Sequence, residues 1–350
     1  MFKQLSAIFL ITICYLNAHN IDTMGRGGVD MAMGADSHSI LSNPSNLNTI
    51  NIKKQITIEP VNGSISLNRD SFNFLKKLYG STNDGKEVSN LMKKNIGKTL
   101  SFQANSFASI YKKENQYCWL IGLNNDINGY FITHSGFGSK GAMESSIEKY
   151  RAIVGTLSSH QQNLQYAVTL KAIEKYETIH NYSIGEIIEN EDITDYFDNK
   201  YTKKEKAIAI DTGISYKLPS NSFNTNIVDT KVALSVLNIG DTTFKELGKI
   251  PSTTNIGFSS KYNEFLFGID YRDLFKAEQN SNFKDSIRFG LSRSFLDNRL
   301  TLSSGILYED FTFGLTYQYS ILNISLSSYK DIEYDHSKER KYKLSLSIAW

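Results

Sequence analysis

The sequence predicts an all-β protein, a transmembrane antiparallel β-barrel of about 14 strands with an N-terminal hatch or plug segment and short helical inserts. Two observations support this fold class. Many segments of about ten residues alternate apolar and polar side chains, as strands do when one face meets lipid and the other a lumen. The chain also ends inside such a segment, because residues 342–350 alternate and the last residue is Trp350.

The composition of the 350-residue chain agrees with this fold class and excludes others. Lys and Arg number 38, and Asp and Glu number 36, so the net charge of +2 gives no stripe for binding nucleic acid. The mean hydropathy of -0.32 is too low for a bundle of transmembrane helices. A barrel can be polar on average, because only one face of each strand contacts lipid.

Residues 1–18 have the features of a secretory signal peptide. Lys3 supplies the positive charge, an apolar run follows over residues 5–16, and Ala18 precedes the predicted cleavage site. The apolar run is too short to span a bilayer. The mature chain then keeps one cysteine, Cys118, which excludes a disulfide within the chain.

Residues 19–51 differ from the rest of the chain and form a predicted hatch segment. A glycine-rich stretch runs from Met24 to Asp36. Glycines permit sharp turns and the close approach of one backbone to another. The step Asn43-Pro44 follows, which favours a turn and can open a short helix.

This segment resembles the N-terminal hatch of FadL-like outer-membrane barrels and of the related TraF-type barrels of conjugative transfer. Those barrels begin with a Met-Gly-Gly-x-Gly-Val-Ala-x-Ala-Asp-Asp-like run, and an Asn-Pro-Ala-x-Leu-like box follows. This chain departs from the pattern at Arg26, Asp30 and Ser45. The hatch-motif residues of this chain are Gly25, Gly27, Gly28, Val29, Ala32, Asp36, Asn43, Pro44 and Leu47.

The resemblance implies a barrel in the outer membrane of a Gram-negative bacterium. Its expected function is the passage of hydrophobic small molecules, with the lumen gated by the hatch segment. The alternative is a non-transport scaffold, the docking barrel of a conjugation or secretion system. The expected partners are outer-membrane lipid and either a hydrophobic small-molecule ligand or a protein of such a system, and not nucleic acid. No cofactor is implied.

An enzymatic function is not expected. A hydrolase would need a nucleophile beside a base, and the six histidines show no spacing that suggests such a pair. No two histidines are spaced to bind zinc from one helix. Cys118 lies in a strand pattern with no identifiable base, which favours a buried and inert thiol.

Residues 52–350 are predicted to form the barrel. The strand pattern is clearest in the C-terminal third and weakest over residues 52–60 and 129–135. Helical inserts are expected near residues 70–97, where apolar residues recur at helical spacing, and near residues 183–202, which open with a capping box.

Several charged residues fall on the strand face that carries polar side chains. Charge is costly in hydrocarbon, but in a lumen opposite charges can pair. One interpretation is a polar lining that tunes permeation, and the other is a set of salt bridges that rigidify the wall. The residues expected to face the lumen are Asp211, Lys217, Asp270, Arg272 and Arg288.

Aromatic residues near strand ends are expected at the membrane interfaces. Residues 311–319 would give one strand a lipid-facing aliphatic centre with aromatic ends. The predicted interface aromatics are Phe311, Phe313, Tyr317, Tyr319 and Trp350.

Overall fold

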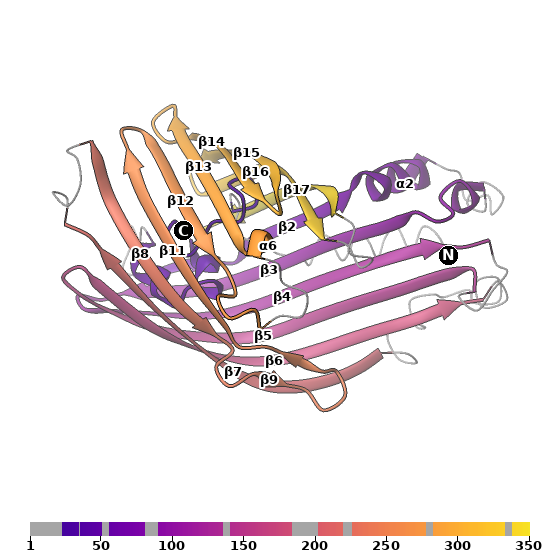
Figure 1. Ribbon diagram of the computed structural model, residues 1–350, viewed down its shortest axis with the longest axis horizontal. Coiled ribbons are helices and arrows are strands. Elements are labelled where there is room, and N and C mark those ends of the chain that lie inside the picture. The colour runs from indigo at the N-terminus through magenta and orange to yellow at the C-terminus, as the bar shows by residue number, and fades with distance from the viewer. Residues whose placement is uncertain are drawn as a thin grey trace.

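The computed structural model describes residues 23–34, 36–50, 56–80, 90–135, 141–183, 202–219, 226–277, 283–332 and 338–350. The predicted signal peptide lies outside these residues, and so does the predicted insert near 183–202 apart from its two end residues. Strands make up most of the described chain and wrap around a common interior (Figure 1).

Fourteen antiparallel strands form a closed barrel, which confirms the predicted fold class. Successive strands pair with each other along the chain, and the last strand pairs with β2 to close the wall. The fourteen are β2 (Val61–Asn68), β3 (Thr99–Lys113), β4 (Tyr117–Thr133), β5 (Met143–Gln161), β6 (Leu164–Tyr182), β7 (Thr202–Lys217), β8 (Ile227–Leu237), β11 (Thr253–Tyr262), β12 (Phe265–Tyr271), β13 (Ile287–Phe295), β14 (Leu300–Leu307), β15 (Asp310–Tyr319), β16 (Leu322–Ile332) and β17 (Lys338–Ile348).

A short strand, β1 (Ile56–Glu59), continues the line of β2. It pairs with the same neighbour, β3, farther along that strand. Ile58 also exchanges backbone hydrogen bonds with Trp350, at N···O distances of 3.0 and 3.1 Å. Pro60 separates β1 from β2, because proline has no N–H to donate to a neighbouring strand. The weak pattern over residues 52–60 therefore belongs to a strand that Pro60 interrupts.

The barrel wall is uneven in height. Strands β3 to β7 have between 15 and 19 residues each. Strands β8 and β11 to β17 have between 7 and 11. The long strands therefore extend beyond the short ones at one end of the barrel, where the helix that follows β2 also lies (Figure 1).

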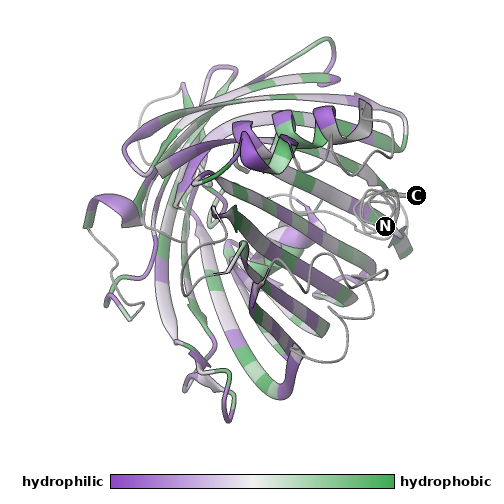
Figure 2. Ribbon diagram, turned by 90° about the vertical axis from the view of Figure 1, so that its right-hand side faces the viewer, coloured by the Kyte–Doolittle hydropathy of each residue, from purple (hydrophilic) through white to green (hydrophobic). Residues whose placement is uncertain are grey.

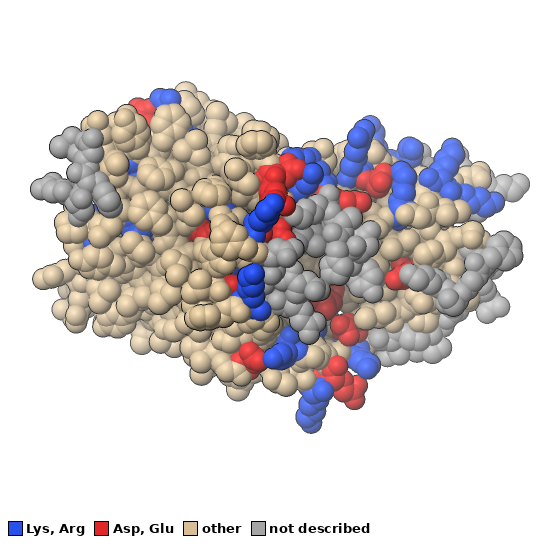
Figure 3. Space-filling view, in the orientation of Figure 1, with Lys and Arg blue, Asp and Glu red and all other residues tan. Residues whose placement is uncertain are grey.

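An apolar belt surrounds the barrel. On β15, Phe313 and Leu315 are exposed, whereas Thr312 beside them points inward and is buried. The same alternation recurs on most strands. In Figure 2 it appears as hydrophobic and hydrophilic bands that follow one another along each strand. Charged side chains gather toward one end of the face shown in Figure 3 and leave much of the other end uncharged. Exposed members of the belt include Leu123, Ile153, Leu157, Leu170, Ile208, Ile214, Leu234, Ile269, Leu291, Leu302, Leu326, Leu344 and Leu346.

Replacing Leu315 by Arg should impair assembly, because a cation at the lipid-facing midplane costs about 2–4 kcal/mol. The matched control is Gln318→Arg on the same strand, at an exposed position of the opposite parity. Heat-modifiability on gels, which separates folded from unfolded barrels, measures the folded fraction after refolding into vesicles. Equal folded fractions for both variants would show that β15 does not face lipid.

Helices are few. The α-helix α2 (Arg69–Gly80) joins β2 to β3, and the side-chain oxygen of Asn68 accepts the N–H of Ser71 at its start, at 2.9 Å. A short helix, α6 (Phe283–Ser286), precedes β13, and a small separate sheet joins β9 (Thr242–Thr243) to β10 (Lys249–Ile250). None of the helices in the described ranges is long and apolar enough to cross a bilayer.

Candidate functional site: the filled lumen

The described part of the hatch segment, residues 23–50, lies inside the barrel. Its backbone turns several times and forms two 3-10 helices, η1 (Ser37–Leu41) and η2 (Pro44–Thr49). Side-chain oxygens cap both helices, because Asp36 accepts the N–H of Ser39 and Asn43 accepts that of Ser45. Pro44 occupies the first turn, where its missing N–H costs nothing. Most side chains of the segment are buried.

The backbone of the hatch segment packs against a row of glycines on the inner face of the wall. A Cβ atom added to Gly290 would lie 2.5 Å from the carbonyl oxygen of Arg26, and one added to Gly305 would lie 2.5 Å from the nitrogen of Gly27. Real Cβ atoms do not approach so closely, so only glycine leaves room for the segment. Gly27 itself has a φ of +74°, a left-handed conformation that side chains disfavour.

The glycine row continues around the wall under the rest of the segment. A Cβ at Gly257 would lie 2.3 Å from the Cβ of Met31, and one at Gly213 would lie 2.1 Å from Oδ1 of Asn43. We call the inward glycines that contact the segment the glycine seat. Its members are Gly213, Gly257, Gly268, Gly290, Gly305 and Gly314.

Asp270 is the main polar anchor of the segment. It is fully buried, and its Oδ2 accepts the backbone N–H groups of Asp30 at 2.8 Å and Met31 at 2.9 Å. The guanidinium of Arg272 donates to the same oxygen at 2.9 Å. Within the segment, Arg26 forms an ion pair with Asp30 at 3.5 Å. A buried carboxylate with these donors holds a backbone turn firmly, because its charge strengthens each hydrogen bond.

Asn43 links the two halves of the segment to the wall. Its Nδ2 donates to the carbonyl oxygen of Met31 at 2.9 Å and to Oγ of Ser215 at 3.1 Å. Ser45 lies beside it, and its Oγ is 2.5 Å from that of Ser215. Wall hydroxyls also donate to carbonyl oxygens of the segment, in the pairs Thr312 to Gly25, Ser259 to Ala32 and Ser235 to Ser42.

The helical half of the segment covers an apolar area of the lumen. Ile40 and Leu47 are fully buried in one cluster with side chains from β3 to β7. Phe107 packs there edge-on against the ring of His38, with centroids 5.5 Å apart. The wall and loop members of the cluster are Phe107, Tyr111, Cys118, Leu120, Ala152, Val154, Ile173, Ala209, Phe244 and Leu247. Part of the lumen lining is therefore apolar.

Burial shifts Asp30, Asp36 and His38 of the segment toward their neutral forms. Burial, and to a smaller extent the nearby charge of Asp30, raises the pKa of Asp36 to about 7. It also raises the pKa of Asp30, against the attraction of Arg26. Burial lowers the pKa of His38 to about 3, helped by the positive charge of Lys343. The His38 ring is therefore neutral at physiological pH and packs as an aromatic group.

The other predicted lumen charges lie in different surroundings. Asp211 is buried, pairs with Lys171 at 2.9 Å and accepts the N–H of Asn238 at 2.8 Å. Arg288 donates to the carbonyl oxygen of Gly28 at 3.4 Å. Lys217 has the inward parity but lies at the end of β7, where its exposed side chain pairs with Asp229 at 2.7 Å. The predicted interface aromatics, from Phe311 to Trp350, are all exposed on the outer face.

The described residues contain no cluster of His, Cys, Asp or Glu suited to hold a metal ion. The thiol of Cys118 is buried in the apolar cluster. This site is therefore a lumen with polar and apolar lining that holds the chain's own N-terminal segment.

The fold is that of known transporter barrels. The toluene transporter TodX of Pseudomonas putida aligns with a TM-score of 0.57 and 11% identity, covering 95% of this chain and 98% of that one. The toluene transporter TbuX of Ralstonia pickettii aligns with a TM-score of 0.58 and 11% identity, covering 96% of this chain and 98% of that one. No family model and no curated protein matches the sequence.

Both similar structures are toluene transporters, which agrees with the FadL side of the predicted resemblance. They give no support to the TraF-type branch. At about a tenth identity, the likeness concerns the fold of the chain.

Proposed function

We propose that this protein is an outer-membrane channel for hydrophobic small molecules, and that the hatch segment gates its lumen. The observation that carries the proposal is the apolar lining under η1 and η2. A channel for polar solutes needs no such surface, whereas a hydrophobic solute would gain by leaving water for it. The similar fold of two toluene transporters supports the same substrate class.

The contacts of the segment suit a gate. Most of its polar contacts are single hydrogen bonds from hydroxyl or amide groups, such as Ser259 to Ala32 at 3.0 Å. Water can replace such bonds at little net cost, since each contributes about 1 kcal/mol. Movement of the segment would then uncover the apolar lining formed by Leu120, Val154 and Ile173.

Deleting residues 23–50 should leave an inserted barrel that takes up toluene faster than the intact protein. The wall does not need the segment for closure, because β17 pairs directly with β2. Uptake into vesicles containing the refolded protein measures the passage, and heat-modifiability confirms that the barrel has folded. A folded deletion variant with unchanged uptake and unchanged single-channel conductance would contradict gating and favour a docking barrel.

A further inference from the structure

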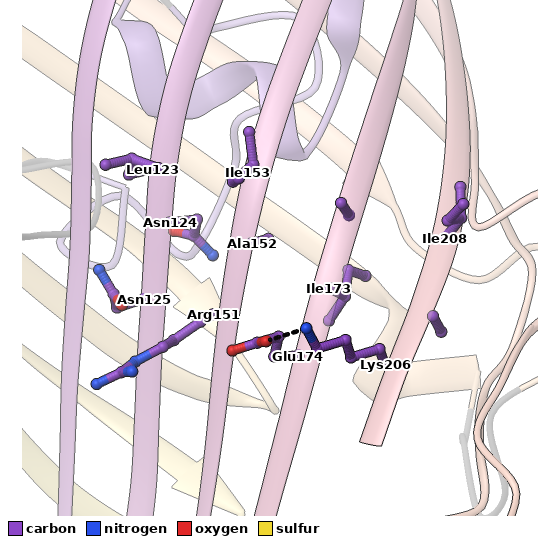
Figure 4. A pocket seen from close by; sticks show the side chains of 12 residues that line it. Leu123, Asn124, Asn125, Arg151, Ala152, Ile153, Ile173, Glu174, Lys206 and Ile208 are labelled. Atoms are coloured by element: carbon purple, nitrogen blue, oxygen red, sulfur yellow. Dashed lines mark ion pairs between the residues drawn. The ribbon is translucent and has the colours of Figure 1, made fainter. Parts of the chain in front are cut away.

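A groove of about 710 Å³ crosses strands β4 to β7 (Figure 4). Three consecutive residues of each strand line it, in the ranges 123–125, 151–153, 172–174 and 206–208. In each range the first and last residues have the parity of the exposed outer face, and the middle one has the parity of the lumen. The groove therefore opens on the outside of the barrel.

The register of the strands arranges the outward groove residues in two rows of different chemistry. One row is apolar and belongs to the belt, and its members are Leu123, Ile153, Ala172 and Ile208. The other row is polar and charged, and its members are Asn125, Arg151, Glu174 and Lys206. The groove thus runs along the edge where the apolar belt ends.

The ring of Tyr176 is surrounded by Arg151 of the charged row and by two further cations. The Cζ of Arg151 is 5.5 Å from the ring centroid, and the Nζ atoms of Lys149 and Lys204 are 5.6 and 4.9 Å from it. The Tyr176 hydroxyl donates to Glu174 at 2.8 Å. We call Lys149, Arg151, Lys204 and Lys206 the cationic cluster.

Positive charge exceeds negative charge at this edge. Glu174 forms ion pairs with Lys206 at 3.0 Å and with Lys204 at 3.4 Å. Arg151 is exposed, and among the described residues no carboxylate pairs with it. Its guanidinium therefore keeps its donors available toward the groove, since the ring of Tyr176 contacts only its face.

We propose that the groove binds a phosphorylated lipid of the surrounding leaflet. The phosphate would bind Arg151, because a guanidinium matches phosphate oxygens with paired N–H donors, and it would share Lys206 with Glu174. The acyl chains would lie along Ile153 and Ile208 toward the middle of the belt. The long connections of a barrel face the cell exterior. The cationic cluster, on the side where β3 to β7 extend, would thus meet the outer leaflet.

Charge and shape together favour a lipid over a free anion. A free phosphate would use only the charged row and would leave the apolar row without a partner. A lipid satisfies both rows, and anionic headgroups attract each nearby Lys or Arg. The inference uses the membrane placement of the proposed function but not the passage of a solute.

The test compares lipid retention by purified variants in non-ionic detergent, measured by native mass spectrometry during titration with diacyl phosphatidic acid. Arg151→Glu/Lys206→Glu should lower the apparent affinity by about tenfold or more, because two attractions near the surface are lost. The control Lys76→Glu/Lys77→Glu makes the same change of net charge on exposed residues of α2 and should bind like the wild type. If the Glu variant does not fold, Arg151→Gln/Lys206→Gln replaces it.

Three results would overturn the proposal. The first is equal retention of phosphatidic acid by the wild type and the groove variant. The second is equal retention of phosphatidic acid and of zwitterionic phosphatidylcholine. The third is displacement of the lipid by inorganic phosphate at the same concentration, which would identify an anion site without a lipid. The readout is lipid binding in detergent, so it is independent of any failure of the uptake experiments.

Discussion

A disulfide between the hatch segment and β7 should stop uptake of toluene, and a reductant should restore it. The pair is Ser45→Cys/Ser215→Cys, made in a Cys118→Ala background so that no other thiol competes. The two hydroxyl oxygens are 2.5 Å apart, close to the S–S length of about 2.0 Å that a disulfide requires. The side chains of Ser and Cys are nearly equal in size, so the two substitutions require little repacking. The segment would then be tied to the wall beside the apolar lining.

The control for the locked pair is Thr156→Cys/Thr169→Cys in the same background. These residues face each other across β5 and β6, with their hydroxyl oxygens 2.8 Å apart, so their disulfide joins wall to wall. Uptake should be the same before and after oxidation of this control. Uptake that continues at full rate through the oxidised Ser45–Ser215 pair would show that passage does not require the segment to move.

Replacing Gly290 by Val should dislodge the segment and shift the equilibrium toward an open passage. Even the first added carbon would lie 2.5 Å from the carbonyl oxygen of Arg26, a backbone atom that no rotamer change can move. Overpacking of this kind costs about 1–3 kcal/mol, which would raise the open population about fivefold to about 150-fold. The expected result is faster toluene uptake, together with cleavage after Arg26 by trypsin, a bond that the native packing buries.

Gly155→Val is the matched control for Gly290→Val. Gly155 is also a strand glycine, but a Cβ added there meets nothing within 4 Å. This variant should keep the uptake rate and the trypsin resistance of the wild type. If Gly290→Val and Gly155→Val behave alike, the glycine seat does not decide whether the segment stays in the lumen.

The strands that the sequence predicted best are those whose two faces differ throughout. Residues 311–319 alternate without interruption, because lipid meets one face and the lumen the other. Two strands carry a weak alternation for a physical reason. On β5 the outward face includes Gly155 and Arg151, so the apolar alternation is lost. On β2 the outward Gly63 interrupts the apolar row of Val61, Ile65 and Leu67.

The lumen site was predicted in part. Asp270 and Arg272 share a face by parity, and the structure places them 2.9 Å apart. The hydrogen bond from the backbone of Asp30 to Asp270 joins residues 240 positions apart, and no local pattern reports such a contact. The glycine seat was missed for the same reason. Its signal was present, since glycine recurs at inward positions of β7 and of β11 to β15, but the partner that requires glycine lies near the other end of the chain.

The seam between β17 and β2 determines the order in which the molecule can be assembled. Ser345 pairs with Ser64, so these contacts join the two ends of the barrel sequence and are the least local in the wall. Contacts between distant parts of a chain form late, because closing a long loop costs entropy. Until the seam closes, the nascent wall is an open sheet with two unpaired edges that invite pairing with other chains. The hatch segment lies inside the finished ring and immediately precedes β1. An assembly factor that holds the open edges apart would therefore also control when the segment becomes enclosed.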